Sequence, residues 1–481
     1  SNVRIGVNAG NSIESGGNYN VTVGDEAGTA ITTGDSSVAV GKDALQANTT
    51  GSNHTAVGYQ AGYSNTTGTT LTALGYKAAF TQTNANANTA VGYQAGYSTT
   101  SGGLNTSIGF EAAYSNTTGS RITAVGYKAA YGNTEGTNNV AIGAAISGLA
   151  GTLGTNTTGD YNVAIGDSAL QANTTADANT AVGYASLLDN TTGNNNVALG
   201  VDSLANNTTA YSNVALGNQS MITNTTGLNN TATGRYSLYA NTTGSSNVAV
   251  GLQALFANTT ASGNTTVGYQ AGLAVTTGGN NQLFGQNCGQ TVTTGVNNTL
   301  IGTAAGSYDG NDLTTGSRNI IIGNYSKTDS SAQTDALVIG YYVVSKGNTT
   351  GFISPGGGGV YQGNNSSTWA QTSDRRLKKN IVDSPIGLAE INQLQVRNFE
   401  YRTVDEVTEL EDHTVIDKSG VQVGIIAQEI QAILPNCVKE ESTGVLSVDP
   451  DNLTWHLIKA VQELSATNDA LAARLTALEG A

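Results

Sequence analysis

An apolar residue followed directly by glycine recurs along the first 340 residues, and the spacing between these pairs is nearly constant. Sixteen of the nineteen intervals between successive anchor glycines are 17 residues, and the other three are 18, 23 and 21 residues. A repeat of fixed length over twenty units predicts a solenoid in which each unit forms one coil. The anchors are Gly6, Gly24, Gly41, Gly58, Gly75, Gly92, Gly109, Gly126, Gly143, Gly166, Gly183, Gly200, Gly217, Gly234, Gly251, Gly268, Gly285, Gly302, Gly323 and Gly340.

Each repeat carries a short alternating stretch just before its anchor. The residue before the glycine is apolar in nineteen repeats, with Thr233 the exception, and two places earlier stands Val, Thr, Ile, Leu or once Gln. This period of two predicts a short strand with one face directed inward. Sequences such as Asn116-Thr117-Thr118-Gly119 predict turns. Seventeen residues leave room for roughly two short strands and two turns per coil, which is too few for a helix.

The expected fold class of residues 1–345 is therefore mostly β, a parallel β-solenoid of 17-residue repeats. The residue three places after the anchor is mostly Ala or Ser, so the interior should be narrow. Coils stacked ~4.8 Å apart make a rod of roughly 90 Å. Because one coil of this kind buries only a few small side chains, a lone solenoid is marginal, and three copies sharing a central core are expected. The prediction is a trimeric β-roll or β-helix.

Two features decorate the repeats, and each has two interpretations. In five successive coils, one aromatic residue stands directly after the anchor and a second stands five places after it, so that two rows of aromatic residues are expected. These rows could stabilise neighbouring coils by stacking, or they could form a platform for sugar rings. The long intervals place insertions near Ile146–Asn156 and Ser307–Leu313, which are either binding loops or simple bulges. The aromatic residues are Tyr59, Tyr76, Tyr93, Phe110 and Tyr127 in one row, and Tyr63, Phe80, Tyr97, Tyr114 and Tyr131 in the other.

The remainder of the chain has a different composition. Charged residues make up 24 of the first 340 positions but 29 of the last 141. Residues 346–372 are expected to be a linker, and residues 373–481 an α+β domain that ends in a coiled coil over 453–479. Leucines fall every seventh position from Leu457 to Leu478, with Val461, Asn468 and Leu475 between them, as in a coiled-coil seam. The expected elements are helices at Ile386–Leu394, Gln428–Leu434 and Asp451–Glu479, and strands at Val396–Tyr401, Val421–Ile426 and Val445–Val448, of which the strand at Val421–Ile426 is expected to be buried.

Charge and residue counts exclude several classes of function. The net charge of −15 leaves no basic stripe for a nucleic acid, and no apolar run is long enough to insert into a membrane as a helix. Cys288 and Cys437 lie in different regions, so a disulfide is not expected. The three histidines are scattered, which disfavours a Ser-His-Asp triad and a histidine metal site. The turn 309–312 resembles a calcium loop only weakly, and no metal or cofactor is expected.

One catalytic pair is conceivable, Ser373 with Lys378. An ammonium has no lone pair, so Lys378 acts as a base only where burial or the neighbouring cations Arg375, Arg376 and Lys379 favour its neutral amine. A serine followed five residues later by a lysine is a weak signal by itself. On the residues alone, a solvated basic turn is the better interpretation.

A family resemblance changes that balance. The stretch 373–381, Ser-Asp-Arg-Arg-Leu-Lys-Lys-Asn-Ile, resembles the start of the intramolecular chaperone auto-processing domain, and the likeness continues through 399–401, 424–430 and 446–449. This self-cleaving serine–lysine peptidase family lies at the C-terminus of phage tail spikes, tail fibres and neck appendages. The resemblance implies that residues 373–481 trimerise and fold the fibre, with Ser373 as nucleophile and Lys378 as base. It also implies a cut between Ser373 and Asp374. The repeats themselves resemble the heads of trimeric bacterial adhesins and the shafts of phage fibres.

The function expected is that of a homotrimeric tail fibre made in the host cytoplasm and carried on the virion. Its partners would be other tail proteins and a host-surface receptor, either a glycan or an outer-surface protein. The rival hypothesis is a cell-surface trimeric adhesin, or a ligand-, ice- or mineral-binding solenoid, whose trimerisation domain stays uncleaved. A polysaccharide depolymerase would need paired carboxylates in a groove, and the acids of the repeats are scattered.

Overall fold

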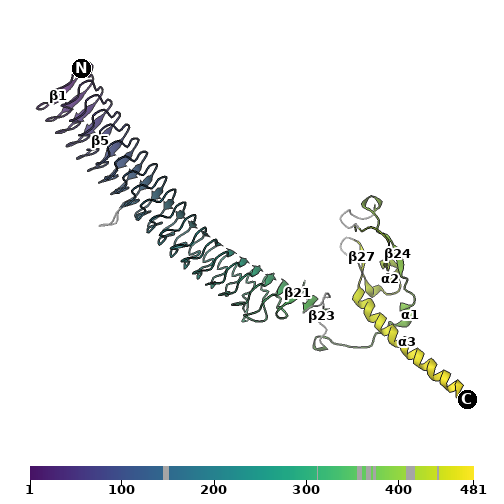
Figure 1. The fold of residues 1–481 in the computed structure, drawn as a ribbon. Coiled ribbons are helices and arrows are strands. Elements are labelled where there is room, and N and C mark those ends of the chain that lie inside the picture. The colour runs from purple at the N-terminus through teal and green to yellow at the C-terminus, as the bar shows by residue number, and fades with distance from the viewer. Residues whose placement is uncertain are drawn as a thin grey trace. The chain divides into compact units, whose positions relative to one another are not determined.

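Every repeat of the solenoid contributes one strand to a single parallel sheet, and the strands stack along one axis (Figure 1). Each strand pairs in register with the next, so that Val163 lies opposite Thr180 and Thr180 opposite Val197. The strands are β1 (Val3–Ile5), β2 (Val21–Val23), β3 (Val38–Val40), β4 (Thr55–Val57), β5 (Thr72–Leu74), β6 (Thr89–Val91), β7 (Thr106–Ile108), β8 (Thr123–Val125), β9 (Val140–Ile142), β10 (Val163–Ile165), β11 (Thr180–Val182), β12 (Val197–Leu199), β13 (Val214–Leu216), β14 (Thr231–Thr233), β15 (Val248–Val250), β16 (Thr265–Val267), β17 (Gln282–Phe284), β18 (Thr299–Ile301), β19 (Ile320–Ile322) and β20 (Leu337–Gly340). The predicted parallel β-solenoid is confirmed.

The computed structural model describes residues 1–144, 151–310, 312–354, 360–363, 370–371, 375–407, 416, 418–440 and 444–480. It divides the chain into two compact units, Ser1–Thr372 and Ser373–Ala481. None of the helices formed by these described residues is both long and apolar enough to cross a membrane.

The coil contains one strand rather than the two that were predicted, because left-handed residues take up the rest of each repeat. The second and fourth residues after an anchor have positive φ in many coils, for example 52° at Lys77 and 51° at Ala79. The anchors themselves have φ between 124° and 149°. A Cβ added at Gly92 would lie 2.3 Å from the carbonyl oxygen of Gly109 in the next coil. Both the backbone conformation and this close approach require glycine, which explains the anchor.

Each chain closes its own core, which corrects the argument that a lone solenoid buries too little. The central strand residue, such as Ala181, and the alanine or serine three places after the anchor point inward and are buried. Large side chains join them: Leu170, Leu187 and Leu204 are fully buried within a single chain. A core shared between three chains is therefore not needed to form the coils.

Two columns of asparagine complete the interior. In the first column, seven residues after the anchor, the Asn190 amide donates to Asn173 Oδ1 at 3.1 Å and to the Gly193 carbonyl at 3.0 Å. In the second column, four residues before the next anchor, Asn196 Oδ1 accepts the backbone N–H of Asn213 at 3.0 Å. Buried amides are costly unless they are hydrogen-bonded, so these bonds between successive coils help to fix the position of each coil. Among the described residues, Asn65 Oδ1 and Asn258 Oδ1 are exceptions without a partner.

The two insertions leave the register unchanged. Val140 pairs with Val163 across the 23-residue interval, and Thr299 pairs with Ile320 across the 21-residue interval. The first insertion includes residues 145–150, which lie outside the described residues. The second is closed at its base, where the Leu313 N–H donates to the Gly306 carbonyl at 2.8 Å.

The expected linker 346–372 contains further strands in its described part. Strand β21 (Thr350–Ser354) adds in parallel to β20, and β22 (Val360–Gly363) and β23 (Ala370–Gln371) then follow antiparallel. The sheet of the solenoid therefore continues into a short antiparallel meander within this stretch.

The second unit is a small α+β structure with a long terminal helix. The predicted terminal helix is present almost as expected, whereas the helix expected at 386–394 forms only over four residues. The strand expected to be buried at 421–426 instead has Val421 64% and Val423 73% exposed. The elements are η1 (Arg375–Leu377), α1 (Leu388–Ile391), β24 (Arg397–Phe399), η2 (Val404–Glu406), β25 (Gln422–Gly424), α2 (Ala427–Gln431), η4 (Pro435–Cys437), β26 (Val438–Glu440), β27 (Leu446–Val448) and α3 (Pro450–Glu479).

Candidate functional site

The junction between the two units carries the proposed dyad, of which the structure describes only one half. Ser373 and Asp374 lie outside the described residues. Lys378 follows η1, and its backbone N–H donates to the Arg375 carbonyl at 3.1 Å. All residues from Arg375 to Asn380 are exposed on the single chain. The burial that would favour a neutral lysine is thus not supplied within one copy.

A small core holds the second unit together. Ile430, Leu434 and Cys437 are buried, and the apolar residues packed against them come from α1, α2, the strands and the start of α3. Burial raises the pKa of the Cys437 thiol, which keeps it protonated and unreactive. This core includes residues of the antiparallel pair β26 and β27, while β24 pairs with β25 in a separate two-stranded sheet.

A carboxylate of helix α3 accepts a hydrogen bond from the start of α1. Glu463 Oε2 accepts the backbone N–H of Leu388 at 2.9 Å, and Lys459 lies 3.7 Å from Glu463 Oε1. Glu390 accepts the Gly387 N–H at 2.9 Å, and that bond lowers the Glu390 pKa. Free N–H groups at the start of a helix are satisfied by such carboxylates. The first half of α3 is thereby fixed on the unit.

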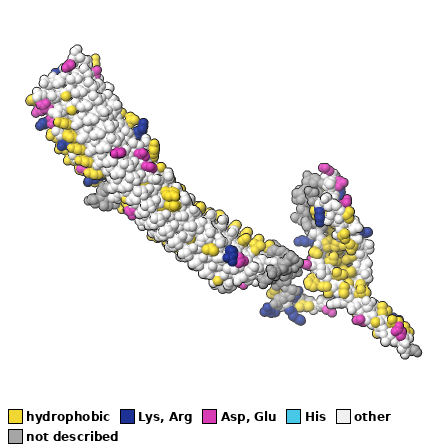
Figure 2. Space-filling model, in the orientation of Figure 1, with side chains coloured by type: hydrophobic (Ala, Val, Ile, Leu, Met, Phe, Trp, Pro, Cys, Tyr) yellow, Lys and Arg dark blue, Asp and Glu magenta, His cyan; other side chains and the backbone are white. Residues whose placement is uncertain are grey.

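The apolar residues of α3 remain largely uncovered. Ala460 alone is buried among the described residues of the helix. Asp449 caps its start by accepting the N–H groups of Asp451 and Asn452 at 3.0 and 3.1 Å. Figure 2 shows hydrophobic side chains gathered on this unit. A helix with a row of exposed leucines is typical of a coiled coil that lacks its partners. The exposed apolar residues are Trp455, Leu457, Ile458, Val461, Leu464, Leu471, Leu475 and Leu478.

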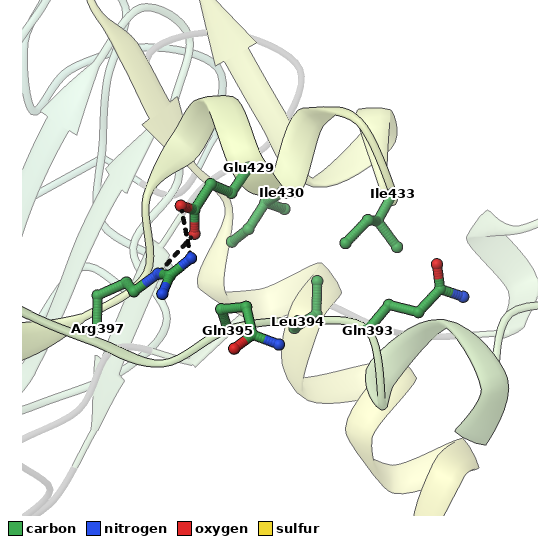
Figure 3. A pocket seen from close by; sticks show the side chains of 7 residues that line it. All are labelled: Gln393, Leu394, Gln395, Arg397, Glu429, Ile430 and Ile433. Atoms are coloured by element: carbon green, nitrogen blue, oxygen red, sulfur yellow. Dashed lines mark hydrogen bonds and ion pairs between the residues drawn. The ribbon is translucent and has the colours of Figure 1, made fainter.

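A cavity of about 270 Å³ opens between α2 and the segment that leads into β24 (Figure 3). Its apolar lining comes from Leu394, Ile430 and Ile433. At one end, Arg397 donates to both carboxylate oxygens of Glu429 at 3.1 and 3.0 Å. This ion pair is partly exposed, so its contribution to stability is small. The described lining holds no serine, cysteine or histidine.

The two aromatic rows form continuous stacks on the solenoid. Neighbouring rings in the outer row, Tyr59 to Tyr127, have centroids 4.9–5.4 Å apart and planes within 16° of parallel. The inner row, Tyr63 to Tyr131, is similar at 5.0–5.2 Å. Lys128 Nζ lies 5.6 Å from the Tyr127 ring centroid and 5.1 Å from that of Tyr131. This geometry accounts for a stabilising role, and ligand binding by the rows stays a prediction.

Sequence reasoning missed two sites on the solenoid. His54 occupies the second asparagine column and is 1% exposed. Near the second insertion, tyrosines from three coils come together. Alignment of the repeats could have found both, because His54 stands where most repeats have asparagine and because tyrosines follow anchors in adjacent coils.

The comparison with known families bears on the second unit. Residues 373–439 match the model of a peptidase family described as the chaperone of endosialidase. That family is an autoproteolytic intramolecular chaperone domain associated with phage tails. No solved structure matches the chain. The C-terminal match and the solenoid of about twenty 17-residue coils fit a tail fibre with a C-terminal chaperone domain.

Proposed function

We propose that this chain is a homotrimeric virion tail fibre whose second unit assembles the shaft and then cleaves itself off between Ser373 and Asp374. The observation that carries the proposal is that the family match begins at Ser373, where the second compact unit also begins. A removable assembly factor needs such a boundary, because cleavage must separate two parts that each hold together.

Helix α3 supports the trimer. Eight large apolar residues of this helix are 44–75% exposed on the single chain. Burying one such side chain contributes about 1.5–3 kcal/mol, so partner helices from two further copies would stabilise the assembly strongly. The family match implies trimeric fibre assembly.

The outer face of the solenoid sheet gives independent support. Parallel sheets are usually covered on both faces, and their strands are then apolar throughout. Here the outward residue before each anchor is apolar in nineteen of twenty coils, yet Leu199 is 50% and Ile301 40% exposed. Charged residues are absent from both outward positions of the three-residue strands from β2 to β19. The outward side chains of these strands thus form an uncharged surface along the solenoid. A surface of this length is best covered by the solenoid of a second copy of this chain.

The chemistry proposed at the junction needs the assembly. Lys378 takes the proton of the Ser373 hydroxyl, whose oxygen attacks the carbonyl carbon of the Ser373–Asp374 peptide in a neighbouring copy, because attack on its own carbonyl would close a strained four-membered ring. The resulting lysine ammonium then protonates the departing amide nitrogen, and water hydrolyses the ester. Since Lys378 is exposed on one chain, a neighbouring copy must exclude water around it for the neutral amine to persist.

Mass spectrometry of the refolded full chain tests the proposal. We expect a fragment comprising residues 374–481, and a trimeric mass for the remainder by light scattering. Ser373→Ala should leave the chain intact and still trimeric. A fragment that begins at Ser373 instead would move the scissile bond. A trimer that forms normally but never cleaves would favour the rival function, an adhesin or ligand-binding solenoid with a permanent trimerisation domain, with which the exposed basic residues at the junction also agree.

Receptor binding is the remaining part of the proposed function. The aromatic rows are the surface proposed for it, because their outer rings are 40–43% exposed and repeat along five coils. A ring inside a stack has neighbours against its two faces, so mainly edges and hydroxyl groups are presented outward. Tyr93→Ala, in the middle of the outer row, should reduce attachment to host cells if the row carries it.

A further inference from the structure

Four tyrosines meet beside the second insertion, at the C-terminal end of the solenoid. Tyr308 lies in the insertion, Tyr325 follows the anchor of the next coil by two residues, and Tyr341 and Tyr342 directly follow the last anchor. The contacting rings have centroids 4.8–6.1 Å apart. The insertion thus contributes to an aromatic surface built from three coils, called the tyrosine cluster below.

The rings of the tyrosine cluster are inclined to one another, unlike those of the stacked rows. Their interplanar angles are 50–78°, against 6–16° in the rows. An inclined neighbour covers only part of a ring face. Tyr341 is 68% and Tyr342 53% exposed, while Tyr308 and Tyr325 are half-buried beneath them. The cluster therefore offers open ring faces on a fixed base.

Polar groups surround these faces. The hydroxyls of Tyr308 and Tyr342 are hydrogen-bonded, and this bond is the main cause that raises the Tyr342 pKa to about 12. Lys327 Nζ donates to the Asp309 carbonyl at 2.6 Å and holds the insertion in place. Asp312 Oδ1 has no hydrogen-bond partner among the described residues, and burial raises the pKa of this carboxyl. The Asp309 carboxylate and phenol hydroxyl groups thus lie near the exposed rings, whereas Asp312 Oδ1 is buried.

We propose that the tyrosine cluster is a binding site for a neutral saccharide. The apolar face of a pyranose ring would pack on Tyr341 or Tyr342, and its hydroxyls would bond to the phenols and to Asp309. Tyrosine suits this role because it gives a large contact area with little conformational entropy to lose. Two carboxylates and one ammonium, from Asp309, Asp312 and Lys327, make the surroundings negative and disfavour an anionic sugar. The inference deepens the receptor-binding part of the proposed function and rests on it for its biological use.

The experiment applies the full-length protein to a printed array of neutral and anionic oligosaccharides. The neutral members are built from glucose, galactose, mannose and N-acetylglucosamine, and the anionic members from uronic and sialic acids. We expect the wild type to retain a subset of the neutral members. Tyr341→Ala should weaken that binding at least tenfold, whereas Tyr341→Phe, which keeps the ring, should stay within about threefold of the wild type.

The matched control is Tyr269→Ala. Tyr269 occupies the same place in its repeat as Tyr341 and is 44% exposed, but it makes no ring contact with a described residue. The Tyr269→Ala variant should bind the array like the wild type. All variants should keep the wild-type melting temperature, because the side chains of Tyr269 and Tyr341 are exposed.

Three results overturn the proposal. They are no retention of any neutral member, stronger retention of anionic members, and equal binding by Tyr341→Ala and the wild type. Loss of binding in Tyr93→Ala alone would place the sugar on the stacked rows. The oligomeric mass and the 374–481 fragment, measured on the same preparation, report separately on the proposed assembly function.

Discussion

A histidine in the core of the solenoid makes the coils around it sensitive to acid. His54 replaces asparagine in the second column, and its Nδ1 accepts the backbone N–H of Leu71 at 3.1 Å. An accepting Nδ1 carries no proton, so the bond requires the neutral ring with hydrogen on Nε2. Burial lowers the His54 pKa from 6.5 to about 4, against a smaller opposing effect of the Gly68 carbonyl.

The sign and size of the effect follow from that shift. The unfolded chain binds this proton near pH 6.5 and the folded chain only near pH 4, so acid favours unfolding between those values. The contribution is fully present above pH 6.5 and is lost as the pH falls through about 4. At pH 4.5 the loss is about 2.5 kcal/mol, calculated from 1.36 kcal/mol per unit of pKa.

The matched variant is His54→Asn, which restores the residue of the column. In an equivalent setting, Asn105 Oδ1 accepts the N–H of Ile122 at 2.9 Å, and its amide donates to the Gly119 carbonyl at 2.9 Å. Asparagine does not titrate, so this variant should lose less stability than the wild type between pH 7.5 and 4.5, by about 2.5 kcal/mol.

Two measurements check this prediction. Urea unfolding at the two pH values gives the difference in stability, and a titration of the histidine C2 protons by NMR gives the pKa directly. A His54 midpoint at pH 6 or above would refute the reasoning. So would an equal loss of stability in wild type and His54→Asn, since other groups would then account for the acid sensitivity.

Four further predictions concern the coils, the second unit and the dyad. Leu187→Ala, inside the solenoid, should cost about 2–5 kcal/mol by urea unfolding, because it leaves a cavity in a closed core. Gly200→Ala should destabilise at least as much, since its Cβ would lie 2.6 Å from the Gly217 carbonyl oxygen at a φ of 140°; wild-type stability would contradict the account of the anchors. Glu463→Gln should lower the melting temperature of the second unit through a weaker bond to the Leu388 N–H, and an unchanged value would show that α1 is held by other contacts. Lys378→Arg should abolish the 374–481 fragment on a gel, because a guanidinium cannot serve as a base; continued cleavage would exclude Lys378 from that role.

The solenoid could be predicted from the sequence because the interval between successive anchor glycines is nearly constant. The strand positions and the need for glycine at the anchors follow from twenty copies of one pattern. The prediction of a second strand in each coil was wrong, because residues with a left-handed backbone conformation cannot be recognised from a pattern of apolar and polar residues. The self-contained core was missed for a related reason: Asn-Thr-Thr-Gly was interpreted only as a turn, whereas asparagines such as Asn190 are fully buried.

In the second unit, local signals predicted the terminal helix well, but they did not predict the length of the helix expected at 386–394 or the packing. The terminal helix, expected from Asp451 to Glu479, follows from the spacing of its leucines, and it forms over Pro450–Glu479. The exposure of Val423 could not be foreseen, since an apolar strand is normally buried. The serine–lysine pair stays a prediction, because Ser373 lies outside the described residues and chemistry at this pair depends on what surrounds Lys378.

A solenoid that closes its own core still leaves a problem of register between chains. Within one chain, covalent connection fixes the order of the coils. Between chains, most coils present the same two outward residues, which are Val or Thr at the start of the strand and Ile, Leu or Val at its end. A shift of one chain by 17 residues would therefore replace each contact with a nearly identical one, and the free-energy difference would be small. Only the non-repeating features distinguish the correct alignment, namely the two insertions, the aromatic rows and the second unit. In the proposed assembly, the second unit joins three chains at one non-repeating end and so removes the shifted alternatives before the shafts associate. Once the shafts have packed along their length, the proposed cleavage would release the second unit and leave the shafts in register.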